Sequence, residues 1–137
     1  MNPRVIVGVE WLTLSDLIAW QKSMAFVSEV YWASDSFPRK ETFGLTAQLR
    51  RAAVSVPSNV AEGQARLTPR DFRNFLGHAR GSLAEAQTQI MIARDLGYLG
   101  PKGSGRLLHL AEDVARLINA LQSSLKDSTA DQRKPNN

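Results

Sequence analysis

Residues 68–97 read TPRDFRNFLGHARGSLAEAQTQIMIARDLG, and they contain the clearest structural signal in the chain. Thr68 is a residue type that caps helix N-termini, and Pro69 follows at the first helical position. Small and apolar residues then recur in steps of four and three: Phe72, Leu76, Ala79, Leu83, Ala86, Ile90, Ala93 and Gly97. Such a sustained heptad pattern is typical of helices that pack lengthwise against neighbours. It predicts a long helix capped by Gly97.

Residues 15–37 carry two apolar seams at helical spacing. One seam consists of Leu17, Trp20, Met24, Val27, Tyr31 and Ser34. The neighbouring seam consists of Ala19, Ser23, Phe26, Val30, Ala33 and Phe37. The seams lie roughly 100–120° apart at 100° per residue, so this helix either sits deep in a bundle or faces two partners. Pro38 disfavours helical geometry at Phe37 and predicts the end of the helix there.

A second helix is expected to begin within residues 41–45 and to end at Gly63. Its seam consists of Leu45, Leu49, Ala52, Val56, Asn59 and Gly63. Pro57 falls inside this helix, where it lacks a backbone donor and crowds the preceding turn. We therefore predict a kink or break within residues 54–58.

The last periodic segment predicts a fourth helix after a glycine-rich loop at residues 100–105. Its seam consists of Leu107, Leu110, Ala111, Val114, Leu117, Ile118, Leu121 and Leu125. Four helices joined by short loops predict an all-α, antiparallel up-down-up-down four-helix bundle. We assign residues 1–13 to an N-terminal extension, residues 14–126 to the bundle domain, and residues 127–137 to a disordered C-terminal tail.

The composition excludes several classes of protein. A length of 137 residues suits one domain, and the absence of cysteine excludes disulfide scaffolds, thiolate zinc sites, Fe–S clusters and cysteine nucleophiles. No run of 18 apolar residues occurs, so we expect no membrane-spanning segment. Residues 1–10 lack a secretory signal pattern, so a cytoplasmic location is expected.

Enzyme motifs are also missing from the sequence. Neither His78 nor His109 has a glutamate three residues before it, as a di-iron bundle site would require. The sequence has no Gly-x-Ser-x-Gly elbow and no Gly-Lys-Ser/Thr phosphate loop. We therefore expect no enzyme activity, catalytic residue, metal, cofactor or small-molecule substrate.

The basic residues are concentrated in the middle of the chain. Residues 39–80 hold eight basic and three acidic side chains, a net charge of +5, while the remaining 95 residues carry −1 of the total of +4. A stripe with seven-residue spacing flanks the apolar seam of residues 68–97: Arg73, Arg80, Gln87 and Arg94. Arginine forks suit phosphate oxygens, so the stripe is a candidate nucleic-acid contact. The candidate residues are Arg50, Arg51, Arg66, Arg70, Arg73, Arg80 and Arg94.

Four segments resemble one bacterial family: LIAWQKSM at 17–24, FGLTAQLRRAAVSVPSNVAEG at 43–63, FRNFL through ARGSLAE at 72–85, and LGYL at 96–99. This is the four-helix-bundle family of 23S ribosomal RNA intervening-sequence proteins, and the resemblance covers about residues 14–125. The family is similar to the accessory variability protein of diversity-generating retroelements, a basic pentameric barrel that binds nucleic acid. The resemblance implies a ring-like homo-oligomer, a pentamer. Besides Arg50, Arg51 and Arg80, it marks as motif positions Pro57, Asn59, Glu62, Gly63, Gly81 and Glu85.

Two functional interpretations remain open from the sequence. In the first, the protein is a non-enzymatic oligomer that binds RNA or DNA through an arginine-rich face of the second and third helices. In the alternative, it is a structural or adaptor oligomer without nucleic-acid binding. Its arginines then form salt bridges between subunits, as residues flanking a heptad seam commonly do.

Overall fold

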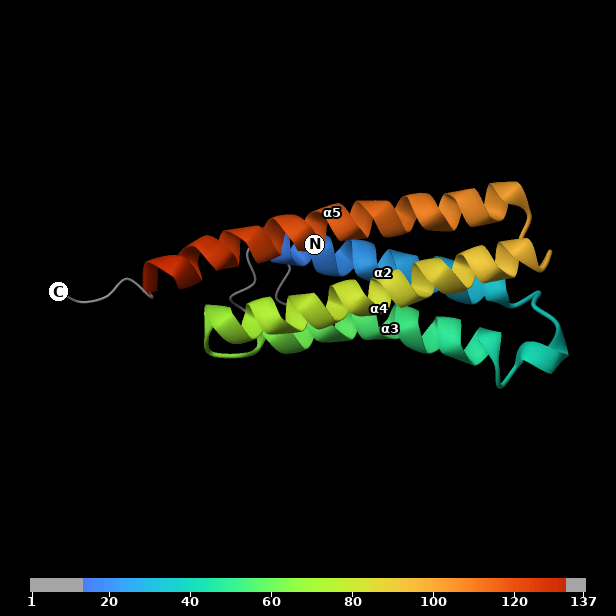
Figure 1. The fold of residues 1–137 in the computed structure, drawn as a ribbon, viewed down its shortest axis with the longest axis horizontal. Helices are drawn as coiled ribbons and strands as arrows, with labels where there is room; N and C mark the ends of the chain where they lie inside the picture. Colours follow the sequence, from blue (N-terminus) through green and yellow to red (C-terminus); the bar gives the residue numbers. More distant parts are fainter. Residues whose placement is uncertain (1–13, 133–137) are drawn as a thin grey trace.

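The computed structural model describes residues 14–132, which form four α-helices and one short 3₁₀ helix. The elements are α2 (Leu14–Ser34), η1 (Arg39–Glu41), α3 (Leu45–Gln64), α4 (Pro69–Asp95) and α5 (Pro101–Gln132). Residues 14–132 contain no β-strand, so the predicted all-α fold with four helices is confirmed. The chain turns back at each connection between the α-helices, which lie lengthwise beside one another (Figure 1). The predicted extension at residues 1–13 lies outside the described residues.

The four α-helices form a closed arrangement in which each helix packs against two others. α2 and α4 both pack against α3 and against α5. The side formed by α2 and α3 therefore lies opposite the side formed by α4 and α5.

α4 begins and ends as its sequence predicts. Thr68 has extended geometry, and its Oγ1 accepts a hydrogen bond from the backbone N–H of Asp71 at 3.1 Å, which satisfies a donor of the first turn. At the other end, Gly97 has a φ of 78°, a conformation that favours glycine. The predicted seam is buried between these caps: Phe72, Leu76, Ala79, Leu83, Ala86, Ile90 and Ala93.

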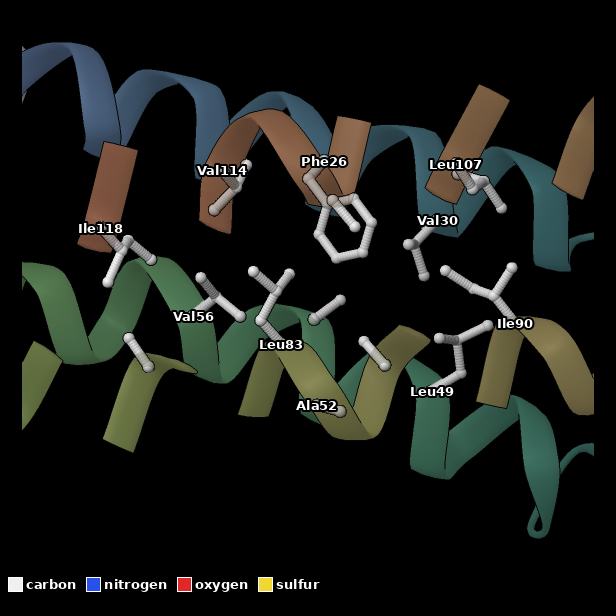
Figure 2. Packing of buried hydrophobic residues seen from close by; sticks show 14 of the residues in the cluster. Phe26, Val30, Leu49, Ala52, Val56, Leu83, Ile90, Leu107, Val114 and Ile118 are labelled. Atoms are coloured by element: carbon white, nitrogen blue, oxygen red, sulfur yellow. The ribbon is translucent and has the colours of Figure 1, made fainter. Parts of the chain in front are cut away.

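The two seams of α2 have different surroundings. Phe26 and Val30 from one seam are fully buried and point into the core with Leu83, Ile90 and Leu107 (Figure 2). The Ser23 hydroxyl on that same buried seam donates to the carbonyl of Ala19 at 2.7 Å, so its polar atom has a partner. In the other seam, Trp20 and Val27 are half-buried and Met24 and Tyr31 are exposed, while Ser34 at its end is buried.

α3 continues through its proline without a break. Of the kink or break predicted within residues 54–58, the break does not occur, because the helix is continuous from Leu45 to Gln64 with Pro57 buried inside it. Side chains beside the proline bond to the turn before them. Ser58 Oγ donates to the Val54 carbonyl at 2.9 Å, and Asn59 Nδ2 donates to the Ser55 carbonyl at 2.8 Å. Pro57 leaves the Ala53 carbonyl without its helical donor, and the bonds of Ser58 and Asn59 reach the carbonyls of the next two residues, so they do not replace the missing bond.

α5 is longer than predicted at both ends. The expected loop at residues 100–105 instead forms the first turns of the helix, because Pro101 suits the first helical position and the Ser104 hydroxyl donates to the Gly100 carbonyl at 2.9 Å. At the other end the helix runs to Gln132, beyond the predicted domain boundary at residue 126. Residues 126–132 contain no glycine or proline that would stop a helix, although the apolar pattern ends at Leu125. Residues 133–137 of the predicted tail lie outside the described residues.

The corner between α2 and α3 is fixed by contacts to the end of α4. The buried Phe37 ring packs at a tilt against Tyr98, with ring centroids 5.6 Å apart. The Tyr98 hydroxyl donates to Glu41 Oε2 at 2.9 Å, and Glu41 Oε1 accepts from the Leu45 N–H at 3.3 Å. The hydrogen bond to Glu41, with burial and the carboxylate charge, raises the pKa of Tyr98. Glu41 thus caps α3 and ties the corner to the residues that follow α4.

Candidate nucleic-acid interface

Three of the candidate arginines are neutralised by carboxylates of the same chain. Arg50 is the most constrained: its Nε donates to Ser34 Oγ at 2.8 Å, and its Nη2 lies 3.4 Å from Asp35 Oδ1. Its guanidinium also lies 4.6 Å from the centre of the Tyr31 ring, a cation–π geometry. The side chain is only 27% exposed. Arg50 therefore joins α3 to the end of α2.

The other two neutralised arginines have local partners. Arg66 pairs with Glu62 at 3.1 Å, and its guanidinium lies 4.8 Å from the centre of the Phe75 ring. Arg94 pairs with its neighbour Asp95 at 3.2 Å. Both ion pairs are exposed, so they contribute little to stability, but they reduce the positive charge that these sites present.

Arg73 and Arg80 lie together in a polar groove between α4 and α5. Gln122 of α5 bridges them, since its Nε2 donates to the Arg73 carbonyl at 3.3 Å and its Oε1 accepts from Arg80 Nη1 at 2.8 Å. The groove has a volume of about 340 Å³, and Asn119 and Ser123 complete its lining, which contains no carboxylate. Among the side chains that the structure describes, residue 16 and residues 18–125, no carboxylate forms an ion pair with either guanidinium. The groove therefore presents two cations and several neutral hydrogen-bonding groups.

Two further candidate arginines are exposed and also lack an ion pair within the part of the chain that the structure describes. Arg70 lies in the first turn of α4, where the positive end of the helix dipole adds to its charge. Arg51 lies on α3, at a shallow hollow shared with Ser82 and Glu85 of α4. Arg51 is thus separated from the groove that holds Arg73 and Arg80.

The predicted single arginine face on these two helices is not what the structure shows. Heptad spacing keeps Arg73 and Arg80 on one side of α4, toward α5. Arg50 turns toward α2, and Arg51 lines both the α3/α4 hollow and a cavity beside the end of α2, so neither joins Arg73 and Arg80. The sequence reasoning also missed Asn119, Gln122 and Ser123. Their three- and four-residue spacing beside an apolar seam was the signal that could have found them.

The motif residues of α3 and α4 mainly hold these two helices together. A Cβ on Gly63 would lie 2.6 Å from the Phe75 Cβ, so the backbone of α3 approaches α4 closely there. Ser55 Oγ and Ser82 Oγ lie 2.8 Å apart across the same pair of helices, and Asn59 Nδ2 donates to Ser55 Oγ at 2.9 Å. These contacts explain the small and hydroxyl-bearing positions of the motif as packing features.

The motif glycine on α4 has no such neighbour. A Cβ on Gly81 would meet nothing within 4 Å, and this residue is exposed. Its place in the motif has no explanation in the contacts of one chain.

The opposite side of the bundle is apolar. A shallow groove of about 380 Å³ between α2 and α3 is lined mainly by Trp20, Met24, Val27, Val54 and Pro57. Met24 is 42% exposed and Val54 is 39% exposed. We call this surface the α2/α3 apolar groove, and the surface of Arg73, Arg80, Asn119, Gln122 and Ser123 the α4/α5 polar groove.

Comparison with known proteins identifies the family. The sequence profile of one family, described as 23S rRNA-intervening sequence protein, matches residues 15–120. The chain belongs to the 23S rRNA-intervening sequence protein family. The resemblance carried by the segments within residues 17–99 is thereby confirmed. The further similarity to the accessory variability protein of diversity-generating retroelements stays a prediction. No curated protein matches the sequence.

A solved structure supports the fold of this 23S rRNA-intervening sequence family member. It is the crystal structure of a protein of unknown function from the S23 ribosomal protein family of Bacteroides thetaiotaomicron, with a TM-score of 0.74 and 16% sequence identity. The match covers 80% of this chain and 99% of that one. At this level of identity the similarity concerns the fold alone. Neither comparison indicates an enzyme family.

Another group of titratable side chains of this family member lies on the surface of α5. His109 Nε2 lies 3.9 Å from Asp113 Oδ2, and Arg116 pairs with the other oxygen of Asp113. Within residues 14–132, no group of three or more potential ligands is placed to hold a metal ion. The same residues include no helix with the length and apolarity needed to cross a membrane.

Proposed function

We propose that this protein is a non-enzymatic, self-associating cytoplasmic protein that binds RNA at the α4/α5 polar groove. The observation that carries the proposal is the difference among its arginines. Arg73 and Arg80 share a groove without a carboxylate, whereas Arg50, Arg66 and Arg94 are neutralised within the chain. Cations that no described carboxylate neutralises are available to an external anion.

The geometry of the α4/α5 polar groove suits a phosphodiester backbone. Arg73 and Arg80 are seven residues apart, so their backbone positions are separated by about 10 Å at 1.5 Å rise per residue. Each guanidinium can donate two parallel hydrogen bonds to phosphate oxygens. The exposed Arg70 continues the positive charge toward the N-terminus of α4. The two guanidiniums can therefore contact phosphates that are not adjacent along a strand.

RNA is the more suitable polymer for this groove. The amides of Asn119 and Gln122 and the hydroxyl of Ser123 can exchange hydrogen bonds with ribose 2′-hydroxyl groups, which DNA lacks. The description of the matched family also names 23S rRNA, which supports the same polymer class.

Self-association would use the α2/α3 apolar groove, on the opposite side of the bundle. Trp20, Met24 and Val27 belong to the seam of α2 that the core of one chain does not cover completely. A second copy of the chain packed there would remove apolar surface from water. We propose a ring-like homo-oligomer, a pentamer, in which repeated polar grooves raise the affinity for a long RNA by multivalency.

The RNA proposal is tested by measuring the affinity of the purified protein for a structured RNA at 50 mM and 200 mM salt. We expect the affinity of the wild type to fall steeply with salt. The variant Arg73→Gln/Arg80→Gln should bind at least tenfold more weakly at 50 mM salt, because two phosphate contacts are lost. Equal affinities of the two proteins would refute the proposal. Loss of assembly in the variant would instead support the alternative in which these arginines form salt bridges between subunits.

The assembly proposal is tested by light scattering of the full chain. We expect the mass of an oligomer for the wild type, and the mass of a single chain for Met24→Asp/Val27→Asp, because two carboxylates in the apolar groove would have to be desolvated. The matched control is Lys22→Asp, which places a carboxylate on the exposed surface of the same helix. A monomeric wild type contradicts self-association.

A further inference from the structure

A cavity of about 820 Å³ opens where the end of α2, η1 and the first half of α3 meet. It is larger than either groove described above and falls within the range of about 300–1,000 Å³ typical of small-molecule sites. Its walls combine arginines, hydroxyl groups and apolar side chains, and we call it the corner cavity.

The corner cavity is positively charged. Arg39, Arg50 and Arg51 line it, against a single carboxylate, Asp35. Asp35 pairs with Arg50, so its charge is already matched. Arg39 and Arg51 are exposed and form no ion pair with any described residue of the chain. Two guanidiniums therefore remain available to an anion inside this cavity.

The remaining wall suits an apolar ring. Phe37, Ala47 and Val54 line the corner cavity beside the charged groups. Phe37 is held by Tyr98, and the preceding Glu41 cap fixes the first turn of α3, so this wall is formed without a ligand. The ligand that fits is thus an anion attached to a body with an apolar face, which a phosphate ion alone does not provide.

We propose that the corner cavity binds a nucleoside phosphate. The phosphate lies at Arg39 and Arg51, and the base lies against the apolar part of the wall. This site is separate from Arg73 and Arg80, so it does not rest on RNA binding at the α4/α5 polar groove. A nucleoside phosphate can reach it as a free nucleotide or as the 5′-phosphorylated end of an RNA.

The test is isothermal titration of the full-length protein with AMP, ATP, adenosine and inorganic phosphate. We expect AMP and ATP to bind at least tenfold more tightly than adenosine, which lacks the phosphate, and than inorganic phosphate, which lacks the base. Competition for bound AMP by a 5′-phosphorylated RNA hexamer, but not by its 5′-hydroxyl counterpart, identifies an RNA end as a source. The absence of such competition identifies the free nucleotide. No binding of AMP or ATP at millimolar concentration overturns the proposal.

Two variants separate the site from general effects of charge or folding. Arg51→Gln should weaken AMP binding at least tenfold, whereas Lys102→Gln, which removes the same charge from the start of α5, should leave it unchanged. Arg39→Gln removes the other guanidinium that has no ion pair, so it should also weaken AMP binding, while the melting temperature without ligand stays unchanged because Arg39 is exposed. Unchanged AMP affinity in both cavity variants overturns the proposal. Binding only by dissociated chains also overturns it, because a second copy would then cover the cavity.

Discussion

The two opposite sides of the bundle differ in chemistry although the same kind of helix forms both. The α2/α3 apolar groove presents Trp20, Met24 and Val27, whereas the α4/α5 polar groove presents Arg73 and Arg80. Both sets flank a buried seam at heptad spacing. The two grooves differ in the residues that flank the seam. The apolar residues suit burial against a second chain, and the arginines suit binding of an anion. A subunit with this arrangement can assemble and bind RNA at the same time.

The largest effect should come from the core that both grooves share. Phe26→Ala should lower the free energy of unfolding by about 3–5 kcal/mol, because it leaves a cavity at a fully buried site of α2. Met24→Ala, on the apolar groove of the same helix, should cost at most about 1 kcal/mol in a dilute, dissociated sample, since Met24 is 42% exposed. Urea unfolding measures both values. Similar losses for the two variants would contradict the distinction between the seams.

A smaller loss of stability is expected at the contact between α3 and α4. α3 borders the apolar groove and α4 borders the polar groove. Gly63→Ala places a Cβ 2.6 Å from the Phe75 Cβ and 3.0 Å from the Phe72 Cδ1. Relieving these overlaps requires the helices to separate, so the free energy of unfolding should fall by about 1–3 kcal/mol. Thermal unfolding measures the change, and an unaltered melting temperature would show that the two helices are not closely joined at Gly63.

Substitution of Gly81, the motif glycine on α4, should change the stability in the opposite direction. Gly81 lies inside a helix with open space around it, so Gly81→Ala should raise the free energy of unfolding by about 0.5–1 kcal/mol through a lower backbone entropy of the unfolded chain. The same thermal experiment measures it. A destabilised Gly81→Ala protein that is also unable to assemble would reveal a neighbouring subunit at this position.

The smallest expected effect on stability comes from the corner between α2 and α3, beyond the apolar groove. Because the pKa of Tyr98 is raised in the folded protein, its proton stabilises the fold at every pH below the unfolded value of 10.0, and this contribution is lost as the pH rises through the folded pKa. Tyr98→Phe removes the hydrogen bond to Glu41 at any pH. The difference in stability between wild type and variant should therefore shrink as the pH rises above 10.0 in chemical unfolding. A constant difference would contradict the role of this proton.

The sequence was sufficient for much of the fold because helices depend on local signals. Thr68, Gly97 and the heptad seam between them predicted α4 within a few residues. The break expected at Pro57 does not occur, because a helix can continue through a proline with the loss of one backbone hydrogen bond, and the packing that buries Pro57 cannot be read from residue order. Residues 126–132 were missed for another reason, since a helix can continue after its apolar pattern has ended.

The candidate site could be predicted only in part because it depends on how the helices are turned against each other. Spacing correctly grouped Arg73 with Arg80, but their bridging partner Gln122 lies 42 residues beyond Arg80. In the same way, nothing near Arg50 in the sequence identifies Ser34 as its hydrogen-bond partner. The corner cavity is likewise a product of packing, since it brings Arg39 of η1 beside Arg51 of α3 and the end of α2.

The most direct test of the account compares two double variants with the same loss of charge. Arg73→Gln/Arg80→Gln changes the arginines without internal carboxylates, and Arg66→Gln/Arg94→Gln changes two that are paired. The measurement is the slope of the logarithm of RNA affinity against the logarithm of salt concentration. We predict that the first variant reduces the slope by about one unit for each lost phosphate contact, whereas the second leaves it close to the wild-type value. Equal slopes for the two variants would contradict RNA binding at the α4/α5 polar groove.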